Sequence, residues 1–518
     1  MKAGKGIERE KTGVSGAVSE GLKAVFTPGG SYEVRWNEQA SVTPFGQMAF
    51  FIEFLNLSGL LESWVNDCPL TYLSPNAPTR MDLLGTWLLS VLAGHKRYSH
   101  VTSIRSDGVN PELLGMNKVV SEDALRRGLE KIPEAAGVAW LQDHLGRSVL
   151  PLLKAPWIMD IDTTVKVLYG KQEGAEVGYN PKKPGRPSHT YHTYLVAGLR
   201  LVLDAEVLPG NKGHSNHTLP GLCRILDALP REQRPYLVRG DCGFGNDPFI
   251  TELEDRGQDY IFKLRQTAGV KRFIERSFAG ARWGDVGGGW EASSGEIQLT
   301  GWDQYRRVVV LRRLIRGDLV LETKDENGQM VLAFMDDDHS GSKGYEYAVL
   351  VTSLPHEELT ITQLYRDRGD AENVFDELKG QWGWGGFTTK DLHRCQLTAR
   401  TVALVYNWWS IYVRLLNPGK RLEAVTSKPL LLAGIAEKTR HARKSRITIT
   451  PMHGYGEQAR ERLTRVSSRL QAWSRNAEQL RIQTVWDCVC DYLVTILTKF
   501  NWFITEIEPP GEPLAGPN

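Results

Sequence analysis

The chain has 518 residues, of which 41% are hydrophobic and 24% are charged. These fractions are ordinary for a folded protein with buried cores and exclude a disordered or fibrous chain. The length exceeds what one hydrophobic core usually serves, so we expect several domains. The formal net charge of +2 neither requires nor excludes a nucleic-acid partner, because the distribution of charge matters more than its sum.

The cysteine spacing points to a reducing compartment, and the hydropathy pattern points to a cytoplasmic protein. The closest cysteines, Cys488 and Cys490, do not have the CxxC spacing of metal or redox sites. Residues 1–11 lack the apolar stretch of a secretory signal. The most apolar run, residues 402–416, is shorter than the roughly 20 residues that a membrane span needs. We interpret it as a core helix and expect a cytoplasmic protein with no membrane partner.

The first part of the chain is predicted to be mainly helical. Residues 1–30 are rich in glycine and charge, so we expect a flexible tail. Over residues 31–150 helical periodicity dominates, and Ser121 is suited to cap a helix that carries Arg126 and Arg127. A short basic helix of this kind suits a helical DNA-binding region. A surface helix with solvated arginines is an equally good interpretation.

The pattern changes after residue 155. Strand-like runs alternate with helical segments over residues 151–266, which predicts an α/β sheet. Over residues 267–358 the helical signal disappears, and strand-like runs separated by Gly- and Asp-rich turns predict a β-rich insertion. Helices resume over residues 359–418. We expect a helical C-terminal region over residues 419–518, with a basic stretch at 438–446.

Carboxylates follow two of the predicted strands. In the run WIMDID, Asp160 and Asp162 share one face, because side chains alternate along a strand. Two carboxylates beside apolar residues are costly unless a cation lies near them, and a metal ion is the simplest such partner. Asp241 follows the apolar run PYLVRG in a matching position. A lone aspartate after a strand is, however, a turn residue more often than a ligand.

A third carboxylate lies in the segment TQLYRDRGDAENVFDELKGQW, which is predicted to form one helix. At about 100° per residue, four polar side chains fall within an arc of about 60° beside the apolar stripe: Tyr365, Arg368, Glu372 and Lys379. Glu377 is expected on the opposite, solvent-exposed side. A ladder of i,i+4 ion pairs explains the polar stripe equally well. Asp376 lies close to the arc and is the rival carboxylate.

Carboxylates in this arrangement suit a hard metal ion. Mg²⁺ prefers oxygen ligands, and two such ions can activate the attacking oxygen and stabilise the leaving oxygen in a phosphodiester displacement. The sequence shows no histidine and cysteine cluster with zinc spacing and no evident Ser-His-Asp arrangement. The three carboxylates therefore favour phosphodiester chemistry.

These residues resemble DDE transposases of the IS4 type, and more closely the IS1380 group. In that family the first Asp is followed by Thr-Thr, as Asp162 is, and the second Asp follows another strand, as Asp241 does. The third carboxylate lies in a Y-x2-R-x3-E-x6-K signature, and this chain keeps every spacing with Tyr365, Arg368, Glu372 and Lys379. The stretch GYNPKKPGRPSH is also similar to the IS1380 group. One departure is Cys242, where relatives often have Ser or Ala.

The resemblance implies a fold class and a site. The fold would be a ribonuclease-H-like α/β catalytic core, interrupted by the β-rich insertion and flanked by helical N- and C-terminal regions. Asp162, Asp241 and Glu372 would bind two Mg²⁺ ions, for which Mn²⁺ can substitute. Other residues would contact DNA phosphate, the DNA backbone or a flipped base: Tyr365, Arg368, Lys379, and one of Trp290 and Trp302. The basic strands around Arg306, Arg307, Arg312 and Arg313 would suit a groove that binds phosphate.

The resemblance also implies an activity. A bacterial, DNA-associated transposase would cleave transposon ends with water and transfer the 3′-hydroxyl strand into target DNA by cut-and-paste through a hairpin. Synapsis of two double-stranded DNA ends implies at least a homodimer. Arg126, Arg127 and residues 438–446 are expected to be further DNA contacts. A catalytically silent, transposase-derived DNA-binding regulator is the first alternative. A metal nuclease of the same core without strand transfer is the second.

Overall fold

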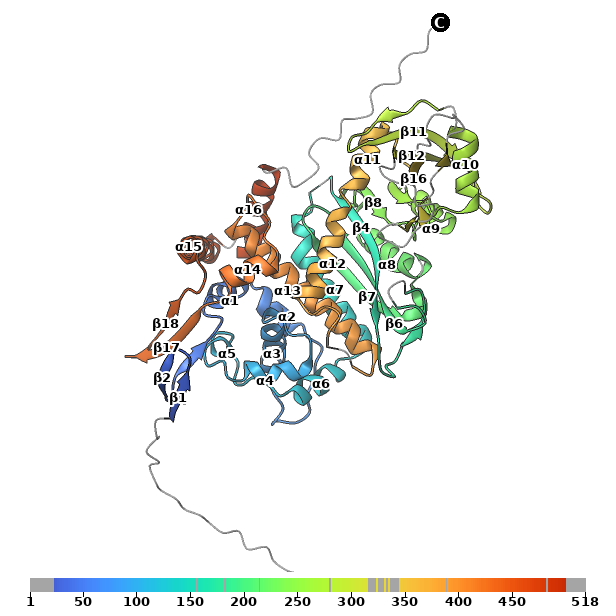
Figure 1. Ribbon diagram of the computed structural model, residues 1–518. Coiled ribbons are helices and arrows are strands. Elements are labelled where there is room, and N and C mark those ends of the chain that lie inside the picture. Colours follow the sequence, from blue (N-terminus) through green and yellow to red (C-terminus); the bar gives the residue numbers. More distant parts are fainter. Residues whose placement is uncertain are drawn as a thin grey trace, which may run out of the picture.

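An eleven-stranded mixed sheet runs through the molecule, with helices packed against it (Figure 1). The computed structural model describes residues 23–499 except for 155, 181–182, 214, 279–280, 315–322, 325–329, 332–333, 336–343, 388 and 481–482. The chain is thus a mixed α/β protein, as the alternation of strand-like and helical segments predicted.

Five strands at the centre of the sheet lie in the order β7-β6-β4-β8-β9. Three are antiparallel neighbours: β4 Ile158–Val167, β6 Pro187–Val196 and β7 Leu201–Pro209. The other two, β8 Leu237–Gly240 and β9 Tyr260–Lys263, run parallel to β4 on its other side. Parallel neighbours need crossover connections, and these contain α8 Ser215–Ala228 and α9 Asp247–Asp255. A short edge strand, β5 Glu176–Val177, pairs with β6.

The strands of the predicted insertion extend the same sheet. β16 Gly344–Thr352 pairs antiparallel with β9 and is followed by β12 Arg306–Leu314, β11 Trp290–Ile297 and β10 Gly284–Asp285. Three shorter strands complete this region: β13 Thr323–Lys324, β14 Met330–Val331 and β15 Phe334–Met335. The prediction that residues 267–358 lack helix was wrong, because α10 spans Ala268–Phe278. Its apolar Val270, Ile274 and Phe278 are buried at helical spacing, which the basic residues between them obscured.

Helices dominate the N-terminal part of the chain. The capping of α6 by Ser121 is confirmed, since its hydroxyl accepts a hydrogen bond from the amide of Ala124. The helices are α1 Met48–Leu57, α2 Leu60–Asn66, α3 Arg80–Leu92, α4 Val101–Ile104, α5 Asn110–Leu113, α6 Glu122–Glu130 and α7 Glu134–Val149.

Three further helices follow the insertion. They are α11 Glu358–Arg366, α12 Gly369–Gln381 and α13 Leu392–Leu416. The apolar run at 402–416 belongs to α13, which is buried along almost its whole length, so its interpretation as a core helix is confirmed. Among the described residues no single helix is long and apolar enough to span a membrane, and α1 and α2 reach that threshold only as a pair bent by 69°.

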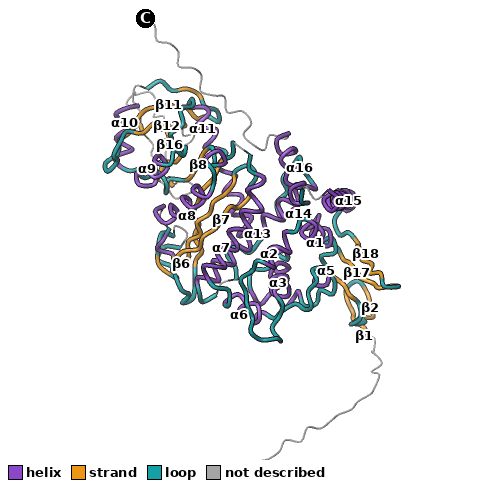
Figure 2. The backbone as a smooth tube through the Cα atoms, turned by 180° about the vertical axis from the view of Figure 1, so that it is seen from behind, coloured by secondary structure: helices purple, strands orange, loops and turns teal. Residues whose placement is uncertain are grey.

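Segments from the N-terminal and C-terminal parts of the described chain lie side by side (Figure 2). β3 Ser41–Thr43 pairs with β17 Ile435–His441, which forms a hairpin with β18 Lys444–Thr450. The remaining C-terminal helices are α14 Ala424–Leu431, α15 Gly456–Leu480 and α16 Val485–Lys499, and α15 contacts α1.

Two predictions about these ends were wrong. Residues 23–30 were assigned to a flexible tail, yet β1 Lys23–Thr27 pairs with β2 Gly30–Val34 across a Pro-Gly turn; residues 1–22 lie outside the described residues. The basic stretch 438–446 was placed in a helical region, yet it forms the β17–β18 hairpin. Ala442 and Arg443 at its turn have φ of 49° and 65°, as a tight two-residue hairpin turn requires.

Candidate active site

One face of β4 lies against the α11–α12 segment (Figure 1). Arg368, at the start of α12, contacts Asp162 of β4, with Nη2 3.2 Å from Oδ2. Near the other end of α12, Lys379 Nζ donates a hydrogen bond to Thr164 Oγ1. Alternation along the strand places Asp162 and Thr164 on the same face, so α12 runs along this face of β4 and is anchored near both of its ends.

Asp160, on the same face, has its cation inside the protein. Arg239 lies opposite it in the register of β4 and β8 and donates two hydrogen bonds to its carboxylate, of 2.7 and 2.9 Å. Both side chains are only 1% exposed. Arg239 Nη1 also donates to the carbonyl of Leu364 in α11. The cation that the sequence required for this carboxylate is therefore an arginine, and Asp160 is a structural residue.

Asp162 has a less complete environment. It is 18% exposed and has one ion pair, with Arg368, and a 2.7 Å hydrogen bond from the amide of Thr163. Because Asp160 aligns with Arg239, two further residues bring Asp162 level with Asp241, on a parallel strand about 4.8 Å away. Asp241 accepts a 2.8 Å hydrogen bond from the amide of Gly243. The two aspartates therefore lie side by side where β4 passes the end of β8.

The charges at this point do not balance. Burial raises the pKa of Asp162 to about 6, the Arg368 guanidinium opposes this rise, and the Asp241 carboxylate adds to it. Burial alone would lower the pKa of Arg368, but Asp162, Tyr365 and Asp241 together raise it. Burial also raises the pKa of the Tyr365 phenol. One guanidinium in direct contact thus serves two carboxylates, and the Lys379 ammonium acts on Asp162 only more weakly.

Two buried polar atoms beside Asp162 have no hydrogen-bond partner among the described residues. One is Arg368 Nε, and the other is the hydroxyl of Thr193, which lies opposite Asp162 in the register of β4 and β6. Thr193 was not predicted as a site residue, because the cross-strand register is not visible in the amino-acid sequence. Carboxylate oxygens, a spare hydroxyl and a deficit of positive charge fit a hard divalent cation such as Mg²⁺.

Glu372 lies on the same side of α12 as Arg368 and Lys379. Arg368 has helical φ and ψ, so the period of about 100° places Glu372 about 40° from Arg368 and about 20° from Lys379. Asp376 lies further round, about 80° from Arg368. The Glu372 side chain is exposed. Its carboxylate and those of Asp162 and Asp241 do not all come within 4.8 Å of one another in the described structure.

The prediction of one helix through the signature was wrong. α11 ends at Arg366 and α12 begins at Gly369, so Tyr365 belongs to a different helix from Glu372 and Lys379. The break at Asp367 and Arg368 was not visible, because both residues are compatible with a helix interior. Tyr365 nevertheless stays close to Arg368, as their mutual electrostatic interaction shows.

The predicted solvent side of α12 is also partly buried. Glu377 is 2% exposed, and its Oε2 accepts a 2.7 Å bond from Arg421 Nη2. Its Oε1 accepts a 2.9 Å bond from the amide of Ala424 at the start of α14. The helix therefore packs on two sides, between β4 and α14. The sequence pattern of one helix does not reveal a second packing partner.

The two candidate tryptophans have different surroundings. Trp302 is 9% exposed and lines a pocket of 420 Å³ together with Cys242 and Gly243, which directly follow Asp241. Arg306 lies over its ring at 5.0 Å. Trp290 is half-buried at the start of β11, with Arg313 over its ring at 4.8 Å. Only Trp302 of the two lines the pocket next to Asp241.

The arginines of β12 do not form the expected groove. Arg306 is buried between Asp247 and Glu254, and Arg307 donates to the carbonyls of Leu354 and His356. Arg312 and Arg313 pair with Glu291 and Glu346. Each guanidinium is used within the protein, because its partners come from neighbouring strands and helices that the sequence did not place.

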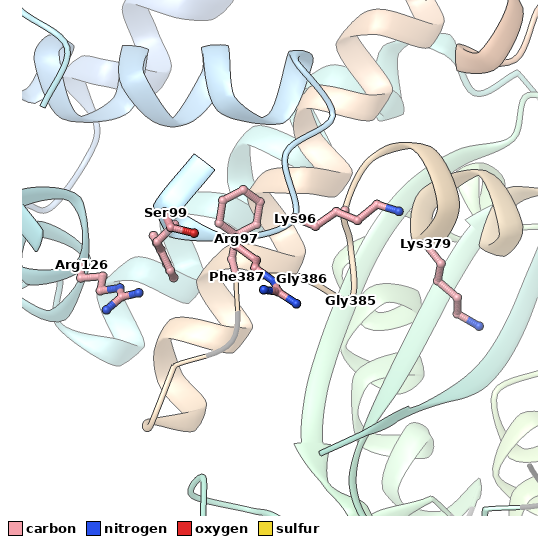
Figure 3. Close-up of a pocket in the computed structure, with 10 residues that line it drawn as sticks. Lys96, Arg97, Ser99, Arg126, Lys379, Gly385, Gly386 and Phe387 are labelled. Carbon is pink, nitrogen blue, oxygen red and sulfur yellow. The ribbon is translucent and has the colours of Figure 1, made fainter. Parts of the chain in front are cut away.

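The two arginines of α6 have different surroundings. Arg126 lines a pocket of 580 Å³ together with Lys379, whereas Arg127 is exposed and donates to the carbonyl of Asp123 within its own helix. Lys96 and Arg97 line the same pocket (Figure 3). These two residues were not predicted as site residues, although the basic run His95-Lys96-Arg97 soon after an apolar helix was a visible signal.

One other group of side chains is spaced closely enough to bind a metal ion, but an arginine forms ion pairs with it. Asp67, Asp143 and His144 are the only group of three such ligands within 4.8 Å of one another in the part of the chain that the structure describes. Arg147 pairs with Asp67 at 2.9 Å and with Asp143 at 2.6 Å. Arg147 pairs directly with both carboxylates, which are about half exposed to solvent, so the group is a surface ion-pair cluster.

The fold and the site together define a mixed α/β protein whose central sheet carries an acidic site with too little positive charge. A family model, the transposase DDE domain group 1, matches residues 79–471. The chain belongs to this family, whose members use divalent metal ions and whose domain implies nuclease or transferase activity.

Seven chains of solved structures also match this chain. One is a piggyBac transposase in a cryo-EM structure of a synaptic complex with hairpin DNA. It shares 10% sequence identity, and the match covers 89% of this chain and 88% of that chain at a TM-score of 0.35. This likeness is too distant to support any inference about this chain. No curated protein matches the sequence.

Proposed function

We propose that this chain is an active transposase that cleaves the ends of its element and transfers the 3′-hydroxyl strands into target DNA. The observation that carries the proposal is that Asp162 of β4 and Asp241, just past the end of β8, both act on the Arg368 guanidinium, in a member of the DDE family. Glu372 is the third carboxylate, because it lies on the side of α12 that is anchored to β4. Assignment to the IS1380 group rests on the stretch GYNPKKPGRPSH.

Asp162, Asp241 and Glu372 would hold two Mg²⁺ ions, or Mn²⁺ in their place. When bound, such ions supply activation of the attacking oxygen and stabilisation of the leaving oxygen. The donor set consists only of oxygens, which suits these hard cations. Glu372 is exposed on the side of α12 that carries Arg368 and Lys379, so its side chain has room to adopt other rotamers when a metal ion binds.

The other signature residues would bind and orient the DNA. Arg368 uses Nη2 to hold Asp162, and its guanidinium charge would lie close to a phosphate at the site. Tyr365 stays protonated because burial raises its pKa, so its hydroxyl can donate to the same phosphate. Lys379, exposed beside Thr164, would attract the next part of the backbone.

The strand order supports a ribonuclease-H-like core. The order β7-β6-β4-β8-β9, with three antiparallel strands followed by two parallel ones, is the arrangement expected of that fold. We propose that residues 151–266 and 359–418 form this core and that residues 267–358 are an insertion whose Trp302 stacks on a flipped base. Residues 31–150 would bind DNA, and residues 419–518 would form a separate C-terminal region. Synapsis of two DNA ends requires at least a homodimer.

One observation favours a second candidate. The carboxylates of Asp162, Asp241 and Glu372 do not all lie within 4.8 Å of one another in the described structure, which is also what a catalytically silent, DNA-binding regulator of this family would show. Such a protein would bind the element's ends and would not cut them. The charge deficit around Asp162 favours the enzyme, because a regulator has no need of a cation there.

The deciding experiment is cleavage of a labelled duplex that carries the inverted repeat flanking the gene, with Mg²⁺. Wild type is expected to nick at the end of the repeat, and Glu372→Gln is expected to bind the duplex without cutting it. Asp376→Asn is the matched control, since it removes one exposed carboxylate from the same helix. Equal cutting by wild type and Glu372→Gln would reject Glu372, and binding without cutting by wild type would favour the regulator.

A further inference from the structure

A basic pocket lies between the N-terminal helices and the helix that carries Glu372. It has a volume of 580 Å³ and is lined by side chains from separate parts of the chain. Figure 3 shows Lys96 and Arg97 between Arg126 on one side and Lys379 on the other. Lys379 also contacts Thr164, two residues beyond Asp162, so the pocket begins beside the candidate active site.

The pocket concentrates positive charge. Four cationic side chains line it, and none of the described residues in its wall carries a carboxylate. Arg126 is partly balanced by Glu122, at 3.4 Å on the neighbouring turn of α6. Lys96 and Arg97 are exposed, and their charged groups have no hydrogen bond or ion pair to any described residue. Such an uncompensated cluster attracts anions.

The backbone of the pocket is held in close contact. Phe387 N donates a 2.8 Å hydrogen bond to the carbonyl of Lys96, and a Cβ on Gly386 would lie 2.3 Å from the same oxygen. A Cβ on Gly383, whose φ is 66°, would lie 2.3 Å from the carbonyl of His95. Glycine at these two positions therefore lets the loop after α12 pack directly on the loop after α3.

The aromatic residues of the pocket are not available for stacking on a base. Tyr98 and Phe387 are each 1% exposed, and their rings pack edge to face with centroids 5.2 Å apart. Arg126 covers the Tyr98 ring at 5.2 Å. The accessible surface is therefore made mainly of ammonium and guanidinium groups and glycine backbone. That chemistry suits a phosphodiester backbone and does not suit a flipped base.

We infer that Lys96, Arg97 and Arg126 bind the sugar–phosphate backbone of the DNA that leads away from Lys379. The inference rests on the proposed function to the extent that the chain binds DNA, and it does not require cleavage. The contact is to phosphates, so it contributes equally to binding of every sequence and its strength falls with salt. One stretch of DNA would then contact both the N-terminal helices, through Lys96, Arg97 and Arg126, and the core, through Lys379.

The test is a salt titration of the full-length protein with a fluorescently labelled 40-bp duplex of arbitrary sequence. EDTA is present, so that neither a metal ion nor cleavage affects the result. Lys96→Ala/Arg97→Ala is expected to bind at least about tenfold more weakly than wild type. The slope of log affinity against log salt should become shallower by about 2, because two phosphate contacts are lost. A second duplex of unrelated sequence should show the same change.

Two controls separate this effect from a general loss of charge. Lys96→Arg/Arg97→Lys keeps the charges and should bind within about twofold of wild type. Arg460→Ala/Arg465→Ala removes two exposed cations from α15 and should keep the wild-type slope. An unchanged slope in Lys96→Ala/Arg97→Ala, an equal loss in the α15 variant, or no salt-dependent binding by wild type would each overturn the inference. Failure of the wild type to cut DNA in the cleavage experiment would leave this result untouched.

Discussion

Asp160 and Asp162 lie two residues apart on the same face of β4, yet their surroundings differ in charge, solvent and hydrogen bonding. Asp160 is 1% exposed and receives two hydrogen bonds from Arg239. Among the described residues, Arg239 forms its ion pair with this carboxylate alone. Asp162 is 18% exposed, receives one bond from Arg368 and shares that guanidinium with Asp241. The first pair is balanced one to one, whereas in the second cluster two carboxylates share one contacting guanidinium, with Lys379 acting more weakly.

The difference shows how a strand can carry a structural and a functional carboxylate side by side. A buried charge needs a partner of opposite charge. When the protein itself supplies that partner, the carboxylate has no need of a bound cation. A site that leaves one charge unbalanced is suited to bind a cation from solution. The number of cations that the chain places beside each carboxylate therefore separates the two roles.

The largest expected effect is on catalysis. Asp162→Asn should lower end cleavage more than the roughly 10–100-fold that is typical of a residue that only orients a metal ligand. Its stability should change little, because burial already disfavours the charged form of this side chain. Cleavage rates and urea denaturation of the same preparation measure both quantities. A stable variant that cleaves normally would break the comparison.

The second effect is on stability. Asp160→Asn leaves the Arg239 guanidinium buried without its counter-charge, which should cost about 3–5 kcal/mol of unfolding free energy. Urea denaturation followed by tryptophan fluorescence measures this loss. The corresponding loss in Asp162→Asn should be much smaller. Similar losses in the two variants would show that both aspartates are structural.

The smallest effect concerns a buried charge on the other side of α12. Lys428 lies over the Trp382 ring at 3.6 Å and donates to the carbonyl of Gln381 at 3.3 Å. Burial lowers its pKa to about 7, and Glu377 opposes this shift. Between that pKa and the ordinary lysine value of about 10.5, the unfolded chain binds more protons than the folded chain. Wild-type stability contributed by this group therefore rises with pH through that window.

Lys428→Met removes the titrating group and keeps most of the apolar side chain. Its melting temperature relative to wild type should be most favourable near pH 6.5 and should decline toward pH 9, as wild type gains stability. Thermal melts at the two pH values give the comparison. A difference that does not depend on pH would mean that Lys428 keeps its charge in the folded protein.

Much of the fold followed from local patterns in the sequence. The α/β alternation after residue 155, the Ser121 cap and the core helix at 402–416 depend on periodicity and on neighbouring residues, and the structure confirms them. Contacts between distant segments could not be predicted. Arg239 as the partner of Asp160, and α14 as the second neighbour of α12, both depend on register and packing across the chain.

The candidate site was predictable to a similar extent. Spacing indicated the three carboxylates and the Y-x2-R-x3-E-x6-K signature, and local strand signals correctly placed Asp241 after a strand. Asp162 was expected at the end of a strand, yet β4 continues to Val167, because the polar residues after Asp162 stay paired with β6. The arginines of β12 were misjudged, because a basic strand shows its charges and does not show the acidic partners that other segments provide. Lys96 and Arg97 were missed for the converse reason, since only folding brings them next to Lys379.

The most direct test of the central claim is a crystal structure of the protein soaked in Mn²⁺, with the metal located by anomalous scattering. We expect the strongest anomalous peaks between Asp162, Asp241 and Glu372, with the Glu372 side chain turned toward the aspartates. The same soak of Asp162→Asn should lose these peaks. Peaks at Asp67, Asp143 and His144 with none near Asp162 would contradict the account.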